Sequence, residues 1–229
     1  AGIIAKNKKG KTETRQTSSS AASLKWLKNT ILLKESELAE QTGQDIYTII
    51  NTEAAKAPIG SNGVMFHPYL AGERSPRSNP RAKGSFVGIS LTTTRQDIMR
   101  SVIEGIGMNL NVIAQQFRDD GYQLDSMPIV GGMGNGAFCR QVFADILNCE
   151  IVTYAYMDEA TAVGAAVLAG IALGIYSDTT AVKKFMEVTS VTKPNIENHE
   201  KYKKLFPLFE QVYEAQLPVY ESLYELSSL

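Results

Sequence analysis

The sequence has 229 residues, of which 44% are hydrophobic and 21% charged. This composition is typical of a globular chain that buries a large core without disulfides or metal, and it excludes the disordered and collagen-like classes. The 23 basic and 24 acidic residues leave a net charge of −1. That balance argues against a dedicated nucleic-acid binder.

The cysteines and the apolar runs indicate the cellular compartment in which we expect the protein. Cys139 and Cys149 have no CxxC spacing and lie in apolar stretches, so we expect core thiols in a reducing, cytoplasmic compartment. The longest apolar run, residues 161–176, is too short to span a bilayer comfortably, so we expect no membrane contact. The sequence opens with Ala1 rather than Met, without a signal segment, so we expect a piece of a longer protein.

The first thirty residues predict a β-hairpin followed by a helix. Two extended runs, residues 2–5 and 12–17, flank a turn signal at residues 7–10. Lysines make the hairpin tip basic, which fits either a solvated turn or an anion site. Three serines at 18–20 then cap a helix that continues to Ile31.

Residues 31–62 have a helical pattern, with Leu38, Ile46 and Ile49 as expected core contacts, and residues 63–66 predict a short strand. The loop His67–Lys83 then combines several prolines with several charged residues. Long irregular loops in compact domains tend to be functional or disordered. A polar surface excursion is the alternative.

Thr94 caps a long predicted helix whose apolar residues recur every three or four positions. Gly105 and Gly107 lower its helix propensity, so we expect another element to pack closely against them. Residues 159–174 predict a helix of small residues, among them Gly164, that we expect to lie close against a sheet.

The centre of the second half alternates strand, helix and strand at residues 127–130, 137–147 and 150–154. This order predicts a parallel βαβ unit with a right-handed crossover. The tail, residues 199–226, is amphipathic and interrupted by Pro207 and Pro218, and we expect its aromatic side chains to pack on the body.

The sequence offers few catalytic signals. His67 and His199 are the only histidines, and neither has the neighbours of a metal site, so packing or solvated roles are favoured for both. Hydrolase, zincin and Walker-type motifs are absent from the sequence.

The glycine-rich segment that follows Val130 is the strongest chemical signal. It consists of Gly131, Gly132, Met133, Gly134, Asn135 and Gly136. Glycines remove the Cβ atoms where a flat ring or a phosphate approaches the backbone, and the following helix start supplies N–H donors. In open α/β sheets, ligands bind outside the carboxyl ends of strands, where this turn falls. From its spacing the segment is either a nucleotide cradle or a tight strand-to-helix turn.

Three segments, one of which includes the glycine-rich residues, resemble the carboxyl-terminal half of the FGGY family of carbohydrate kinases. Residues 84–104 resemble its second signature, residues 131–147 its adenosine motif and residues 159–166 the helix that closes that motif. The loop at residues 68–76 is most similar to the xylulose-kinase branch. The resemblance implies an α/β, actin-like ATPase (ribonuclease H-like) domain with a mixed sheet flanked by helices. Residues 1–229 would be its ATP-side half, with an inserted segment at about 31–90.

The same resemblance implies ATP and Mg²⁺ as cofactors and a small-molecule sugar, D-xylulose in the first instance, as phosphate acceptor. Gly131–Gly136 would hold adenosine, and Ala21 and Lys25 match family positions near the purine or ribose, although Lys25 also fits a simple surface charge. Gly136 departs from the Asn of the glycerol-kinase branch, a role for which Asn135 is the candidate substitute. The loop near Glu73 would face the cleft or brace the hinge.

Catalytic and metal-binding residues are expected outside this chain, because the family places the sugar pocket, the Asp base and both phosphate turns before it. A first strand of the sheet would also be lacking, which predicts an open strand edge and either homodimer formation or reliance on the other half. We therefore expect no phosphate transfer by this chain alone. The alternatives are a gluconate, ribulose or glycerol kinase half, or a non-catalytic nucleotide-binding or assembly module.

Overall fold

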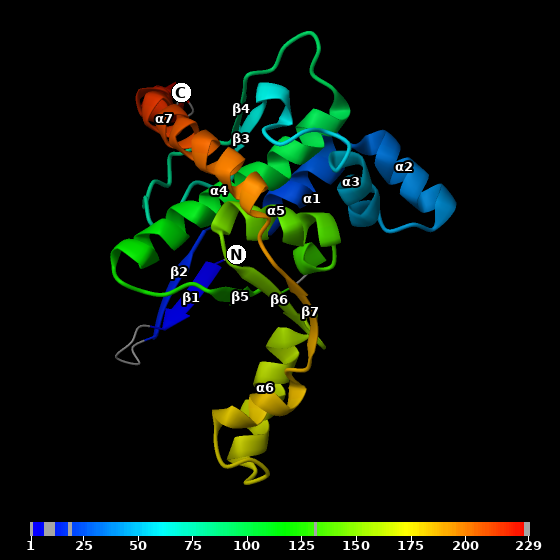
Figure 1. Ribbon diagram of the computed structural model, residues 1–229, viewed down its shortest axis with the longest axis vertical. Coiled ribbons are helices and arrows are strands. Elements are labelled where there is room, and N and C mark those ends of the chain that lie inside the picture. The colour runs from blue at the N-terminus through cyan, green and yellow to red at the C-terminus, as the bar shows by residue number, and fades with distance from the viewer. Residues whose placement is uncertain (1, 7–11, 18–19, 131, 227–229) are drawn as a thin grey trace.

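The computed structural model describes residues 2–6, 12–17, 20–130 and 132–226, and in it the long helix α4 contacts α1, α3, α5, β1 and β3 (Figure 1). The elements of the first half, with 3₁₀ helices labelled η, are β1 (Gly2–Lys6), β2 (Thr12–Gln16), α1 (Ser20–Thr30), α2 (Leu33–Thr42), α3 (Ile46–Ala54), η1 (Ser61–Gly63), β3 (Met65–His67), β4 (Ser85–Val87) and α4 (Arg95–Asp119). Those of the second half are β5 (Ser126–Pro128), η2 (Gly132–Gly134), α5 (Ala137–Leu147), β6 (Glu150–Tyr154), α6 (Ala160–Ala172), η3 (Thr179–Phe185), β7 (Val188–Thr192) and α7 (Ile196–Leu226).

The strands confirm the predicted hairpin and the predicted βαβ unit. β1 and β2 pair antiparallel, while the basic tip at residues 7–11 lies outside the described residues. β5 and β6 pair in parallel, with Met127 opposite Ile151, and α5 forms the crossover between them. β7, which the sequence pattern did not predict, pairs antiparallel with β6 and makes this sheet mixed.

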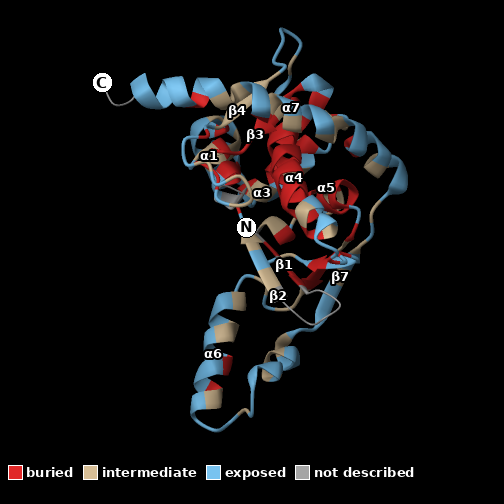
Figure 2. Cartoon of the chain, turned by 90° about the vertical axis from the view of Figure 1, so that its left-hand side faces the viewer, coloured by how far each residue is buried: buried red, intermediate tan, exposed pale blue. Residues whose placement is uncertain are grey.

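Helix α4 begins where the sequence predicts and forms the centre of the core. The Thr94 hydroxyl accepts the Asp97 N–H at 3.2 Å, and the Asp97 carboxylate accepts the Thr94 N–H at 2.8 Å, so two otherwise unpaired donors are satisfied. Figure 2 shows α4 buried along most of its length. A Cβ at Gly105 would collide with the carbonyl of Phe66, which confirms the predicted close packing.

Helix α6 and η3 form an arm, residues 160–185, that projects from the body (Figures 1 and 2). The prediction that α6 lies against a sheet is wrong, because nothing lies within 4 Å of a Cβ placed at Gly164. Gly170 packs closely, but against Tyr176 of the same arm. Among the described residues, none of the helices is both long enough and apolar enough to span a membrane.

Helix α7 corrects a second prediction, because it continues through Pro207 and Pro218 without interruption. An interior proline costs a helix roughly 3 kcal/mol, and here buried aromatic side chains on both sides of each proline hold the helix on the body. A third correction concerns Leu38 on α2, which is 47% exposed. The other expected contacts of that region, Ile46 and Ile49, are buried as predicted.

Candidate functional site

The glycine-rich turn lies where the sequence placed it, between the end of β5 and the start of α5. Ile129 extends the pairing beyond β5 by donating its N–H to the carbonyl of Val152 at 3.0 Å. Gly132–Gly134 then form η2, and α5 begins after Gly136, which has extended dihedrals and no side chain to cap the helix. Gly131 lies outside the described residues. The turn therefore opens at the carboxyl end of a strand that has a parallel neighbour.

The backbone of the turn is held by Arg140 from the second turn of α5. Its guanidinium donates to the carbonyl oxygens of Gly134, at 2.5 Å, and Asn135, at 3.0 Å. The exposed Asn135 side chain donates to the carboxylate of Asp158 at 3.2 Å. Asn135 is thus turned toward the loop that follows β6, and the amide next to the helix start comes from another residue.

That amide belongs to Asn51 on α3, a residue that the sequence did not single out. Its Oδ1 accepts the N–H of Cys139 at 3.1 Å, and its Nδ2 donates to the carbonyl of Tyr47 at 2.7 Å. The first N–H groups of a helix lack intrahelical acceptors, so Asn51 caps α5 from a distance. A Cβ at Gly136 would occupy the space of this side chain. Glycine at this position therefore leaves the space that the capping side chain of Asn51 occupies.

Two N–H groups at the start of α5 stay open to a ligand. Arg140 N makes the first intrahelical bond, to Gly136 O, and Asn51 takes Cys139 N. Within the described part of the chain, the N–H groups of Ala137 and Phe138 have no protein acceptor. The helix start thus offers two donors and the positive end of its dipole to a polar or anionic group.

The two predicted residues lie on α1, a helix separate from the turn. Lys25 is exposed and, among the described contacts, makes no hydrogen bond or ion pair. Ala21 lies in the first turn of α1. α1 packs on α4 and α2, and it is α3 that contacts α5.

The loop at residues 67–83 is anchored by the buried carboxylate of Glu73. Glu73 Oε2 accepts the Thr17 hydroxyl at 2.8 Å and the Asn109 amide at 2.7 Å, and Oε1 accepts the Arg74 N–H at 2.7 Å. Thr17 directly follows β2, and Asn109 is in the middle of α4. The loop therefore braces the hairpin against the central helix.

A ladder of contacts with α7 holds the other side of the same loop. His67 donates Nε2–H to the Phe209 carbonyl at 3.0 Å, and its ring stacks on Phe209 with centroids 4.3 Å apart. The Arg77 guanidinium lies 3.6 Å from the centroid of the Tyr213 ring. The remaining rungs join Arg77 to Glu210, Ser85 to Gln216 and Arg81 to Glu221.

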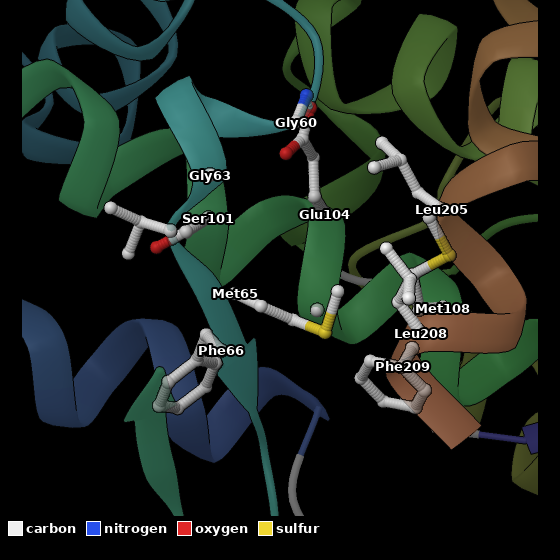
Figure 3. A pocket seen from close by; sticks show the side chains of 12 residues that line it. Gly60, Gly63, Met65, Phe66, Ser101, Glu104, Met108, Leu205, Leu208 and Phe209 are labelled. Carbon is white, nitrogen blue, oxygen red and sulfur yellow. Dashed lines mark hydrogen bonds between the residues drawn. The ribbon is translucent and has the colours of Figure 1, made fainter. Parts of the chain in front are cut away.

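Figure 3 shows a separate cavity of about 100 Å³ between β3, α4 and α7. Its wall is mostly apolar, and none of the predicted site residues line it. Glu104 at its edge is occupied by protein donors, since its carboxylate accepts from Arg100 at 2.7 Å, Tyr202 at 2.9 Å and Ser61 at 2.8 Å. The cavity therefore separates packed elements and adds no chemistry to the turn.

The two thiols are inert, as expected of core residues. Burial raises the pKa of Cys139 to about 12 and that of Cys149 to about 11, so both are protonated near neutrality and poor nucleophiles. Neither is paired in a disulfide.

Comparison with known proteins places the chain. Residues 12–173 match the model of the "FGGY family of carbohydrate kinases, C-terminal domain". The chain belongs to this family. The match covers the hairpin strand β2, the turn and α6, while α7 lies beyond it.

Relatives and solved structures agree with the assignment. Xylulose kinase of Staphylococcus epidermidis is 38% identical over 83% of this chain and 36% of its own length, and gluconokinase of Bacillus licheniformis is 31% identical over 81% and 36%. The ligand-bound xylulose kinase of Lactobacillus acidophilus has a TM-score of 0.77 and 29% identity, covering 93% of this chain and 41% of that one. The fold is the actin-like ATPase fold of these kinases, as predicted. The chain spans about a third of the length of the curated relatives it matches.

Proposed function

We propose that the protein is an ATP-dependent sugar kinase and that this chain is its ATP-side half. The observation that carries the proposal is the turn at Gly132–Gly136, which combines a Cβ-poor backbone with the open N–H groups of Ala137 and Phe138. Flat and anionic groups suit such a turn. Family membership makes ATP the expected ligand, and we propose Gly131–Gly136 as the adenosine site.

Different residues would position the different parts of the bound nucleotide. Asn51 accepts the Cys139 N–H at the start of α5, and Arg140 donates to the turn carbonyls, so protein contacts hold the backbone on both sides of the open donors. We propose the α1 positions Ala21 and Lys25 as a second wall for the purine or ribose. Mg²⁺ would enter with the ATP phosphates, as the metal that the family membership implies.

Phosphate transfer requires the nucleophile, phosphate and metal to be held in line. We propose that the sugar pocket and the base belong to the rest of the longer protein, and that residues 31–90 are an insertion in this half. The free thiols support the expected cytoplasmic location. Assays of the 229-residue chain with ATP, Mg²⁺ and xylulose should give no turnover, and adding the amino-terminal half should restore it. Turnover by the chain alone would contradict this division.

D-Xylulose is the proposed acceptor, supported by the identity to the staphylococcal xylulose kinase. The gluconokinase relative keeps gluconate as the second candidate, with ribulose and glycerol behind it. Comparing kcat/KM of the intact protein for the four compounds decides between them. Nucleotide binding with no turnover of any acceptor by the intact protein would favour the non-catalytic module.

The turn is tested by Gly132→Val in the intact protein. A branched side chain there should block the approach of the purine and weaken ATP affinity by roughly tenfold or more. Ala215→Val is the matched control, because it adds a branched side chain at an exposed position of α7, outside the turn and beyond the family match. Unchanged ATP affinity in a folded Gly132→Val protein would refute the assignment.

A further inference from the structure

A second cavity, of about 230 Å³, lies between the last turns of α4, the carboxyl end of α5 and the first turns of α7. Its polar wall consists of Asn111, Gln115, Arg118, Asn148, His199 and Lys203. None of these residues belongs to the turn or to the loop at 67–83. α5 has 11 residues, so the cavity lies about 16 Å from the turn, at the opposite end of this helix.

Cationic groups line the cavity without a matching acid. No Asp or Glu is among the residues that line it. Lys203 has one exposed partner, Glu200, at 3.5 Å. The buried acid Asp145, whose carbonyl contacts His199, is occupied by Gln141 Nε2 at 2.7 Å, Asn195 N at 2.7 Å and Asn198 Nδ2 at 2.9 Å. The cavity thus has an excess of positive charge.

Arg118 is the unusual member of this set. It is half-buried, and burial lowers its pKa, yet none of the ion pairs among the described residues includes it. Its guanidinium donates to the Leu147 carbonyl and, at 3.5 Å, to Asn111. The nearby Cys149 is no counter-ion, because burial raises its pKa to about 11. Buried charges in proteins are normally paired.

His199 adds a donor or acceptor on the α7 side. Its Nδ1–H donates to the Asp145 carbonyl at 2.8 Å, which fixes the ring and leaves Nε2 without a protein partner among the described residues. Arg118, His199 and Lys203 therefore approach the cavity from two helices, with the amides of Gln115 and Asn148 beside them.

We propose that this cavity binds a small phosphate-bearing anion, either inorganic phosphate or a phosphate monoester. Guanidinium and ammonium groups form charge-assisted hydrogen bonds with phosphate oxygens. The volume accommodates a phosphate with a few further heavy atoms, and Met108, Ile146 and Phe206 supply an apolar wall for a carbon chain. The carboxyl end of α5 repels anions in part, so binding in the millimolar range is expected.

The test titrates the intact protein with inorganic phosphate at low salt, observing the amide signals of Gln115 and Asn148 by NMR. Saturable shifts below roughly 20 mM support the proposal, and their absence overturns it. Glycerol 3-phosphate is the second probe, and tighter binding of it than of phosphate identifies a monoester as the ligand. Saturating adenosine, which has no phosphate, should leave both titrations unchanged because its proposed site is at the other end of α5.

Variants separate the cavity from general surface charge. Lys203→Gln should weaken phosphate binding by about fivefold. The matched control is Lys204→Gln, at an exposed neighbour that does not line the cavity, and its affinity should stay within about twofold of wild type. Arg118→Gln should abolish binding, and the exposed Lys203 keeps the test valid if that variant fails to fold. Equal losses in Lys203→Gln and Lys204→Gln would overturn the proposal.

Discussion

Helices α4 and α6 both have interior glycines, yet one is the centre of the core and the other is the exposed part of the arm (Figure 2). In α4, Gly105 lets the Phe66 backbone approach, and Gly107 leaves room for the side chain of Ile146. In α6, Gly164 has no neighbour, and Leu168 is 61% exposed. Small residues therefore permit close packing, but a partner element must be present to use the space.

The two helices also differ in how they carry charge. α6 has no charged residue, whereas α4 buries Arg100 and Glu104 side by side at 2.7 Å. The buried pair is tolerated because Arg100 also donates to Ala57 O at 2.7 Å and to Tyr202 at 3.0 Å. An apolar helix is normally buried on all sides. The arm is therefore the region where packing against another part of the protein would bury the most exposed apolar surface.

The largest expected loss of stability comes from breaking the buried ion pair of Arg100 and Glu104 on α4. Arg100→Met removes the cation and leaves Glu104 buried, which should lower the free energy of unfolding by about 4 kcal/mol. Urea denaturation of the variant measures this loss. Replacing both residues, Arg100→Met with Glu104→Met, should recover much of it, since no unpaired charge is left. A single variant as stable as wild type would contradict the pairing.

The glycines test the contrast directly. Gly105→Ala places a Cβ against the Phe66 carbonyl and should cost on the order of 3 kcal/mol. Gly164→Ala meets nothing and should instead stabilise α6 by up to about 1 kcal/mol, because alanine favours helix. Thermal unfolding of both variants gives the comparison. A loss at Gly164 equal to that at Gly105 would show that the arm is packed after all.

The core should also depend on pH through His67 on β3. Burial lowers its pKa from 6.5 to about 4. Between these two pH values the unfolded chain binds a proton at His67, whereas the native chain does not. The contribution of neutral His67 to the free energy of unfolding is fully present above pH 6.5. It is lost as the pH falls toward 4, by roughly 3 kcal/mol in all. His67→Gln keeps an N–H for Phe209 O and should flatten this part of the stability profile. Identical profiles for the two proteins would contradict the assignment.

The smallest effect concerns helix ends. Asn51→Ala removes the cap of α5 and should cost about 1 kcal/mol, with a weaker ATP affinity in the intact protein. Glu159→Ala, at the start of α6, is the control because its side chain makes no capping bond. Hydrogen exchange of the Cys139 amide reports the loss of the cap locally. Equal exchange in wild type and Asn51→Ala would argue against capping.

The sequence predicted those structural features that depend on residues close together along the chain, such as the bounds of helices. Periodicity and capping residues placed α4 after Thr94 and gave α5 its bounds, Ala137–Leu147. Asn51 was missed because its partner, Cys139, is 88 residues away. The same limit applies to α7, where distant aromatic contacts outweigh Pro207 and Pro218, and to Gly164, where no partner element lies in reach.

The ladder between the loop and α7 has a consequence for synthesis. His67 and Phe209 are separated by 142 positions, and Ser85 and Gln216 by 131. A ribosome makes the loop long before the helix that holds it, and chains fold from the amino-terminal side as they emerge. Glu73 can form its hydrogen bonds to Thr17 and Asn109 before α7 is made. The partners of His67 and Arg77 are on α7, so their contacts form later. The loop therefore becomes fully ordered only after α7 has been made, and a nascent chain that lacks α7 should be cut there by a protease.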